Sequence, residues 1–415
     1  MAEPATIGDV PAPDGSPARP IRLAILDDNP FVRSLDGRVH PRAALFHRFA
    51  EAVVGAGPFA PAAYLVPVRD LAPDEAPPTL EAVDGGRLTV VPTVPFEGIE
   101  GYLRHGPALV RRNWPIIRDA IAGADLVWIK APASNAAIVA IACRIARVPR
   151  FTWVAGSVRD VVRGQPGRST MTAPIAWATA VAYDATTRLL ERTGPAVRLD
   201  ERLFTSVVRR EELGPGPGRD RSADGPCRLV WAGRIAPEKG LDDLLRAMTD
   251  LVAVGRDVRL DVVGDGPTRP ALERDAAARG LDGRVRWLGY IGDRGAYLDA
   301  LRAADLFVLS SRAEGLPKVV VEAMAAGVPV VATRVGAVPA LLDDGRRGRL
   351  VPPGDPAALA AAIGDLADDP ATRAELSQAG LAFAAAHTAE AQAARLVDWL
   401  RQTFPALPWP PEART

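Results

Sequence analysis

The chain has 415 residues, of which 48% are hydrophobic and 24% are charged. This composition is that of a globular protein and excludes a disordered or fibrous one, and the length exceeds one ordinary core, so we expect two domains. Fifty basic residues balance fifty acidic residues, which argues against nucleic acid as a partner.

The compartment is indicated by what the sequence lacks. Its two cysteines, at positions 143 and 227, are far apart and exclude a disulfide scaffold and a cysteine-rich zinc site. The longest uncharged run, 169–183, is too short to span a membrane, and the first residues lack the basic start and apolar core of a signal peptide. We therefore expect a cytoplasmic protein.

The first half of the chain predicts one Rossmann-like domain over residues 20–210. Residues 1–19, rich in Pro, Ala and Gly, are expected to be a disordered tail. Beyond the tail, short apolar runs alternate with segments of helical spacing, which is typical of βαβ units on a parallel sheet. We predict strands at 21–26, 63–66, 88–91, 126–129 and 150–154, and helices at 41–54, 135–146 and 174–190. Asp27 and Asp28 are interpreted as polar loop residues after the first strand.

The second half predicts another such domain over 227–386. Residues 211–226 are rich in Gly and Pro, which predicts a linker, and the alternation then restarts. We predict strands at 228–231, 259–263, 285–288, 306–309 and 328–332, and helices at 241–254, 267–279, 296–303, 318–326, 357–366, 371–386 and 388–403. The predicted fold is α/β, with two Rossmann-like domains whose parallel sheets face a central cleft, where ligands of open α/β sheets bind.

The first segment with chemical character is Trp-Ala-Gly-Arg-Ile-Ala-Pro-Glu-Lys-Gly, in which a predicted strand runs into a loop and a helix. Gly233 allows close approach of the backbone to a ligand. Arg234 and Lys239 are two cations beside a helix N-terminus, an arrangement that suits a diphosphate. Lys239 is one of only three lysines among fifty basic residues. A surface loop with two solvated cations is the alternative.

The second segment centres on the sequence Glu-Gly-Leu-Pro after a predicted strand. Pro317 stands where a helix should begin, so the amides of Gly315 and Leu316 are predicted to point out of a helix N-terminus toward an anion. Glu314 precedes this helix and Glu322 lies about a turn and a half into it, so the two carboxylates should face different parts of one ligand. The apolar neighbours of Glu322 argue against an exposed helix face.

These two segments resemble the retaining glycosyltransferases of family 4, which have the GT-B fold. Gly-Arg-x4-Lys-Gly is followed 75 residues later by Glu-Gly-Leu-Pro-x4-Glu-Ala-Met-Ala-x-Gly, and the Glu-x7-Glu pair of that family corresponds to Glu314 and Glu322. Val-Val-Gly-Asp-Gly-Pro at 262–267 and Trp-Leu-Gly-Tyr at 287–290 add to the resemblance. It covers 225–355 closely and the N-terminal half in outline.

The resemblance implies a nucleotide-sugar donor, UDP- or GDP-linked, a hydroxyl acceptor, transfer with retention, and neither a metal nor another cofactor. Arg234 and Lys239 would hold the diphosphate, Glu314 would bind hydroxyls of the transferred sugar, and Glu322 would bind the ribose. Further donor-binding residues implied by it are Gly233, Leu288, Tyr290, Gly315, Leu316, Pro317, Lys318 and Val319. Residues 387–415 would carry a last helix that crosses back to the first domain.

The N-terminal half departs from the family pattern. A single glycine, Gly37, stands in place of the Gly-Gly loop that often follows the first strand. The histidine that relatives often carry in the cleft is missing, and Asp160, with Ser157 as the alternative, is the candidate in its place. Because the usual linker motif is missing as well, the sequence does not identify the acceptor.

Several alternatives stay open. Residues 104–118 mix arginines with Trp and aliphatic residues, which predicts an amphipathic helix, with contact to an anionic membrane surface as the alternative. A GT-B epimerase or phosphorylase and a nucleotide-sugar-binding pseudoenzyme are the other functions considered, although the intact Glu314 argues against the pseudoenzyme. The oligomeric state is either monomer or homodimer.

Overall fold

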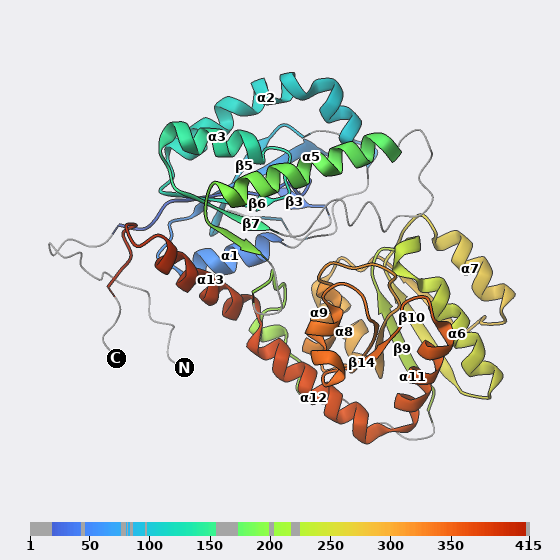
Figure 1. Cartoon of the computed structure of the whole chain (residues 1–415). Helices are drawn as coiled ribbons and strands as arrows, with labels where there is room; N and C mark the ends of the chain where they lie inside the picture. The colour runs from blue at the N-terminus through green and yellow to red at the C-terminus, as the bar shows by residue number, and fades with distance from the viewer. Residues whose placement is uncertain are drawn as a thin grey trace. The chain divides into compact units, whose positions relative to one another are not determined.

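The computed structural model describes residues 19–42, 46–75, 80, 82–83, 86–95, 98–154, 173–198, 203–216 and 225–411 (Figure 1). The chain divides into two compact units. Unit 1 comprises Met1–Ser157, Ala178–Leu199 and Gln392–Thr415, and unit 2 comprises Val158–Trp177 and Asp200–Ala391. The predicted tail, 1–19, lies outside the described residues except for its last one.

Unit 1 is built on a sheet whose strand order, in the described residues, is β3-β2-β4-β1-β6-β7-β8, with β5 beside β4. Its strands are β1 (Leu23–Leu26), β2 (Phe31–Arg33), β3 (Val39–Pro41), β4 (Ala62–Asp70), β5 (Leu88–Thr93), β6 (Leu126–Ala131), β7 (Arg150–Val154) and β8 (Ala196–Arg198). All pairings are parallel except that of β2 with β3. The helices are α1 (Phe46–Ala56), α2 (Gly98–Ala122), α3 (Ala136–Ala146) and α5 (Ala173–Arg192).

Aromatic residues form much of the core of unit 1. Trp128 on β6 packs against Phe151 and Trp153 on β7, with ring centroids 5.5 and 5.6 Å apart. The last helix, α13 (Ala389–Thr403), begins in unit 2 and continues into unit 1. There the ring centroid of Trp399 lies 5.7 Å from that of Phe151. The C-terminal helix thus completes the aromatic core of the first unit.

Unit 2 carries an all-parallel sheet of order β11-β10-β9-β12-β13-β14 in the part of the chain that is described. The strands are β9 (Cys227–Ala232), β10 (Val258–Val263), β11 (Val285–Gly289), β12 (Leu306–Leu309), β13 (Val330–Thr333) and β14 (Arg349–Val351). The helices are α6 (Leu241–Ala253), α7 (Arg269–Ala278), α8 (Arg294–Arg302), α9 (Lys318–Ala325), α10 (Val338–Leu341), α11 (Pro356–Asp368) and α12 (Pro370–Ala386).

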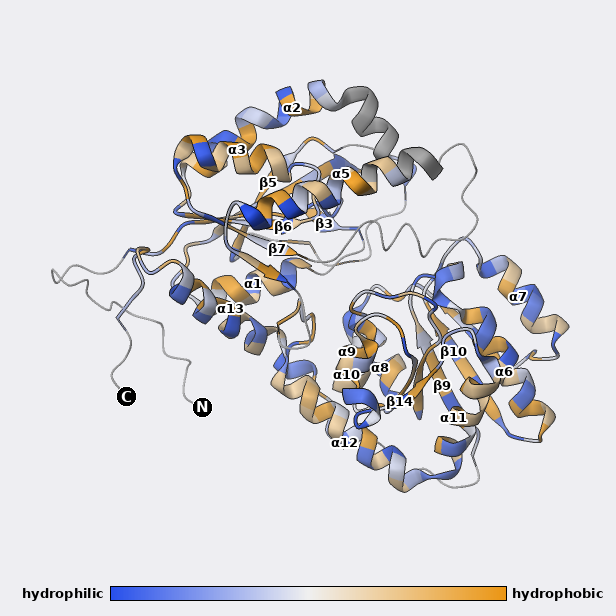
Figure 2. Ribbon diagram, in the orientation of Figure 1, coloured by the Kyte–Doolittle hydropathy of each residue, from blue (hydrophilic) through white to orange (hydrophobic). Residues whose placement is uncertain are grey.

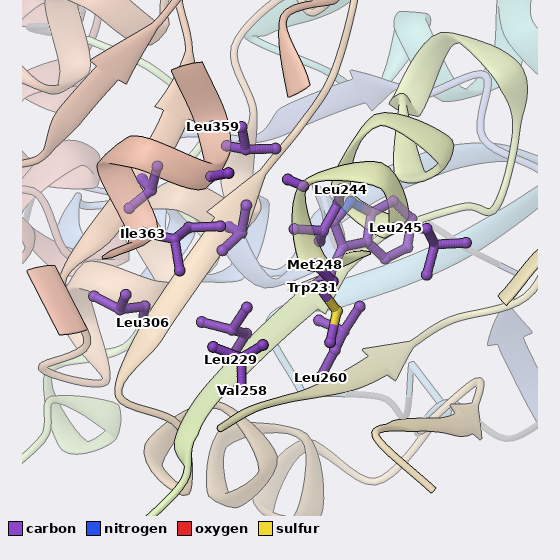
Figure 3. Packing of buried hydrophobic residues seen from close by; sticks show 14 of the residues in the cluster. Leu229, Trp231, Leu244, Leu245, Met248, Val258, Leu260, Leu306, Leu359 and Ile363 are labelled. Atoms are coloured by element: carbon purple, nitrogen blue, oxygen red, sulfur yellow. The ribbon is translucent and has the colours of Figure 1, made fainter. Parts of the chain in front are cut away.

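The core of unit 2 explains why its strands read as continuous apolar runs in the sequence. Both faces of β9 and β12 are buried, and Figure 2 shows hydrophobic residues along the central strands. On one face, Leu229 and Trp231 of β9 lie with Met248 of α6 and Ile363 of α11 in one cluster (Figure 3). Burial on both faces makes the sheet a rigid support for the loops at its carboxyl end.

The predicted α/β architecture, with two Rossmann-like domains on parallel sheets, is confirmed, and the differences lie in short elements. The predicted helix 41–54 begins later, at Phe46, because the chain before it forms the β2–β3 hairpin. The edge strands β8 and β14 and the helix α10 were not predicted. Elements of three or four residues are too short to produce a periodic hydrophobic pattern.

The chain enters unit 2 before the predicted linker 211–226. Phe204 and Val208 are buried in the core of unit 2, and Leu213 packs against the same cluster. Residues Arg210–Glu212 form a 3-10 helix, and the amide of Gly214 donates to Ala325 O at 2.7 Å. Of the predicted linker, 217–224 lies outside the described residues.

Candidate functional site

The two chemical motifs of the sequence meet at the carboxyl end of the unit 2 sheet. The strands β9 and β12 pair side by side, so the loops that follow them leave the same edge of the sheet. Lys239 Nζ on the first loop lies 2.7 Å from Glu314 Oε1 on the second, although 75 residues separate them in the sequence. The predicted convergence of the lysine and the carboxylate is therefore present in the structure.

Close backbone packing holds the two loops together. Gly240 has a φ of +61°, and a Cβ at this position would lie 2.1 Å from the carbonyl oxygen of Ser310. The Ser310 hydroxyl donates to the carbonyl of Lys239 at 3.1 Å. Because glycine alone fits this contact, the Lys-Gly of the first motif fixes Lys239 beside the second loop.

Glu314 is a largely buried carboxylate with one oxygen in use. Its Oε1 accepts from Lys239 and from the Ser311 hydroxyl, the latter at 2.6 Å. Within the described residues, Oε2 accepts no hydrogen bond. Glu314 therefore keeps an acceptor available while Lys239 holds its position.

Arg234 joins this group indirectly. Its guanidinium lies 2.5 Å from Glu238 Oε1, and Glu238 immediately precedes Lys239. The Arg234 side chain is 59% exposed, and this contact uses one of its five N–H donors. The structure therefore places Arg234 on the same loop as Lys239, but not in contact with Glu314.

The N-terminus of α9 presents backbone donors next to Glu314. Pro317 occupies the N-cap position and is buried, while Gly315 is exposed, with open space around the position of a Cβ. The amides of Gly315 and Leu316 have no hydrogen-bond partner among the described residues. Such unsatisfied amides at a helix N-terminus attract an anion.

The remaining residues of the predicted donor set lie on α9, on β11 or directly after it, and after β9. Lys318 and Val319 open α9, where Val319 packs against the core. Leu288 is the last residue but one of β11, and Tyr290 directly follows the strand; both are exposed, at 39% and 52%. Gly233, at the end of β9, donates its amide to Val263 O at 3.0 Å.

Glu322 is buried in an ionic network that the sequence did not predict. Arg294 Nη1 donates to Glu322 Oε1 at 2.5 Å, and the Tyr297 hydroxyl donates to Oε2 at 2.9 Å. Arg294 also donates through Nε and Nη2 to both carboxylate oxygens of Glu212, at 2.9 and 3.0 Å. Burial lowers the pKa of Arg294, but Glu212 and Glu322 outweigh it and raise the pKa overall.

Neither a hydrophobic period nor a motif in the sequence predicts this network. Arg294 and Tyr297 come from α8, and Glu212 comes from the stretch that was predicted to be a linker. Their spacing in the sequence, 82 residues between Glu212 and Arg294, carries no short-range pattern. They are functional candidates that only the fold brings together.

Unit 1 has a polar cluster of its own. Asp27 lies in the loop after β1, as predicted, and the cluster forms around its carboxylate. Asp27 is buried, and its carboxylate accepts hydrogen bonds from Lys130 Nζ and from the Tyr64 hydroxyl, both at 2.5 Å. Burial alone would raise the pKa of Asp27, but the charge and hydrogen bond of Lys130 outweigh it, so the pKa is lowered. For Asp28, burial raises the pKa, and hydrogen bonds from Ser134 offset this only in part.

Of the two candidates predicted in the N-terminal half, the structure describes only Gly37, which lies outside that cluster. Gly37 lies in the turn of the β2–β3 hairpin with a φ of +86°, where its amide donates to Ser34 O. Such a conformation favours glycine, which accounts for its presence without a ligand. Asp160 and its alternative Ser157 lie outside the described residues.

Across the described residues, no group of three or more His, Cys, Asp or Glu side chains has an arrangement that could hold a metal ion. The described helices include none with both the length and the apolar character needed to cross a membrane.

Two comparisons, with a family model and with solved structures, show what the chain is similar to. Residues 226–369 match the family model described as Glycosyl transferases group 1. Over 93% of its length the chain resembles the structure of sucrose-phosphate synthase from Thermosynechococcus elongatus, with a TM-score of 0.67, 20% identity and coverage of 100% of that chain. Anabaena Alr3699/HepE in complex with UDP and glucose gives a TM-score of 0.62 at 18% identity, covering 92% and 100%. The predicted GT-B fold is thereby confirmed.

Particular sequence relatives are similar over less than half of this chain. Alpha-D-kanosaminyltransferase of Streptomyces kanamyceticus is 37% identical over 171 residues, which are 41% of this chain and 43% of that protein. D-inositol 3-phosphate glycosyltransferase of Streptomyces scabiei is 38% identical over 189 residues, covering 41% and 42%. The chain thus spans less than half the length of these curated relatives.

Proposed function

We propose that the protein is a retaining glycosyltransferase that moves a sugar from a UDP- or GDP-linked donor to a hydroxyl acceptor without a metal. The contact between Lys239 and Glu314 carries this proposal, because it joins a phosphate-binding cation to a sugar-binding carboxylate at the carboxyl edge of a parallel sheet. The match of 226–369 to group 1 glycosyl transferases supports the same conclusion.

In this proposal the diphosphate binds beside Lys239 and the N-terminus of α9. The Lys239 ammonium has three N–H donors and uses one on Glu314. Its other donors and the amides of Gly315 and Leu316 suit phosphate oxygens. Arg234 adds a second cation, and because its pairing with Glu238 is exposed, exchanging that carboxylate for a phosphate costs little.

Glu314 then orients the transferred sugar. Its Oε2, which accepts no hydrogen bond within the described structure, would take a hydrogen bond from a sugar hydroxyl. The pairing of Lys239 with Oε1 fixes the position of the carboxylate, so the sugar and its phosphate are held by one rigid pair of side chains.

The chemical step exchanges one bond to the anomeric carbon for another. The bond from that carbon to the phosphate oxygen breaks, and the acceptor oxygen bonds to the same face of the sugar. The acceptor proton passes to the departing phosphate oxygen. Charge accumulates on the diphosphate as it leaves, and Arg234, Lys239 and the α9 amides stabilise that charge without reorganising.

The test is a panel of UDP-, GDP- and dTDP-sugars, with donor hydrolysis followed by mass spectrometry. The proposal predicts slow release of the nucleoside diphosphate from one class of donor, and NMR of the released sugar should first show the donor's anomeric configuration. No release from any donor, or inversion of configuration, would contradict the proposed activity.

A further inference from the structure

Glu322 is clamped by two residues on one face of α8. Arg294 and Tyr297 are three positions apart, so they lie on neighbouring turns of the same helix face. Each binds a different oxygen of the Glu322 carboxylate, at 2.5 and 2.9 Å. The Arg294 guanidinium also lies over the Tyr297 ring, 5.4 Å from its centroid, which fixes the two side chains against each other.

The clamp leaves Glu322 able to bind a further ligand. A carboxylate oxygen has two lone pairs, and each oxygen of Glu322 accepts one hydrogen bond from α8. One lone pair on each oxygen is therefore left for donors such as the adjacent hydroxyls of a ribose. Because the carboxylate is buried, removing Arg294 would leave a buried charge without its partner, which costs stability.

The second carboxylate on Arg294 fixes the guanidinium in turn. Glu212 takes two parallel hydrogen bonds from Arg294 and also accepts from the amide of Arg209 at 2.9 Å. Glu212 belongs to the 3-10 helix Arg210–Glu212, next to residues that are packed in the core of unit 2. The guanidinium is therefore held on two sides, which preorganises its third contact to Glu322.

We propose that Arg294 is a positioning residue that aims the Glu322 carboxylate at the ribose hydroxyls of the donor, with Tyr297 as its helper and Glu212 as its anchor. This rests on the proposed function, in which Glu322 binds the ribose. The arrangement gives the chain a preference for ribonucleotides that depends on a residue outside the Glu-x7-Glu motif.

The experiment compares each nucleoside diphosphate with its 2′,3′-dideoxy analogue by calorimetry, using UDP and GDP as probes. In the unmodified protein the ribonucleotide should bind at least about tenfold more tightly, the value of one charge-assisted hydrogen bond. In Arg294→Met this ratio should fall below about threefold, while affinity for the dideoxy analogue stays within about twofold. Tyr297→Phe and Glu212→Gln should lower the ratio by smaller factors.

A matched control separates positioning from general stability. Arg256 forms a bidentate pair with Asp368 at 2.6 and 2.7 Å, away from the residues discussed above, and Arg256→Met should leave the ratio unchanged. If Arg294→Met does not fold, the ratio of ribonucleotide to dideoxy affinity is measured in Arg294→Lys and Tyr297→Phe instead, and a lowered ratio supports the positioning role. Both variants should fold, because neither leaves the buried carboxylate without a polar partner.

The outcomes distinguish this proposal from the proposed function. If the folded Arg294 and Tyr297 variants keep the affinity ratio of the unmodified protein, the positioning role of Arg294 is overturned. The proposed function is not affected by that result. Equal losses for the ribonucleotide and its dideoxy analogue would also overturn the positioning role, since a merely structural residue acts on both. If the unmodified protein shows no preference for ribose, or binds neither nucleotide, the assignment of Glu322 fails and the positioning role fails with it.

Discussion

Each unit of the molecule places one of the chain's three lysines against a carboxylate at the carboxyl end of its sheet. In unit 1, Lys130 pairs with Asp27 at 2.5 Å; in unit 2, Lys239 pairs with Glu314 at 2.7 Å. The exposed fractions of the side chains differ, at 17% and 1% for the first pair and 25% and 9% for the second.

The two pairs differ most in what else the carboxylate accepts. Asp27 takes additional hydrogen bonds from Tyr64 and Asn29 on its other oxygen, so both of its oxygens are occupied. Glu314 has one oxygen without a donor in the described structure. We infer that the same type of ion pair stabilises the fold in unit 1 and binds ligand in unit 2.

The largest expected effect tests whether the ion pair of unit 1 stabilises the fold. Lys130→Met leaves Asp27 buried without its counter-ion and should lower the free energy of unfolding by about 3–5 kcal/mol. Lys239→Met should lower it by about 1 kcal/mol, because its pair is more open to water. Urea unfolding of both variants measures the difference, and equal losses would contradict the distinction.

The next effect concerns catalysis. Glu314→Gln keeps the shape of the side chain but removes the charge that orients the sugar, so turnover should fall about a hundredfold. Nucleotide affinity should survive, since the diphosphate is bound by other groups. Donor hydrolysis and calorimetry measure the two quantities. Asp368→Asn, which alters an exposed ion pair in the same unit, is the control; unchanged turnover in Glu314→Gln would reject its role.

A smaller effect tests whether Lys239 of the unit 2 pair binds the diphosphate. Lys239→Ala removes one charge-assisted contact to the diphosphate, worth roughly 1.5–3 kcal/mol, so the affinity for UDP or GDP should fall about ten- to a hundredfold. The affinity for inorganic pyrophosphate should fall in proportion. Equal affinity of variant and unmodified protein in calorimetry would contradict the assignment.

The smallest effect is the pH dependence of the unit 1 pair. The pKa of Asp27 is lowered in the folded protein, so its contribution to stability is present above the unfolded pKa of about 4 and is lost as the pH falls through the folded pKa. The stability advantage over Asp27→Asn should therefore shrink below pH 4, by at most about 1.4 kcal/mol per pH unit. A stability advantage that grows as the pH falls would show that the pKa of Asp27 is raised in the folded protein, which contradicts this prediction.

The central strands of both units could be predicted, because strands such as β1 and β12 are buried throughout and are apolar in sequence. The motifs of unit 2 could be placed as well, because they lie close to strand ends. The contact of Lys239 with Glu314 followed from two loops at the ends of parallel strands. The hairpin that contains Gly37 could not be predicted in the same way, since its strands have three residues each.

The network around Glu322 shows a different limit. Glu212 and Arg294 are charged residues whose sequence context is ordinary, and each would suit a solvated surface. Only the packing of residues next to Glu212 onto the unit 2 core brings its carboxylate to α8. Contacts between distant segments of this kind depend on tertiary structure and leave no local pattern.

The central claim is that Lys239 and Glu314 bind two parts of one sugar diphosphate. A crystal structure with the nucleotide sugar selected by the donor panel tests it most directly. The account predicts a phosphate oxygen within hydrogen-bonding distance of Lys239 Nζ and a sugar hydroxyl on Glu314. A donor bound with its diphosphate away from Lys239, or with its sugar away from Glu314, would contradict it.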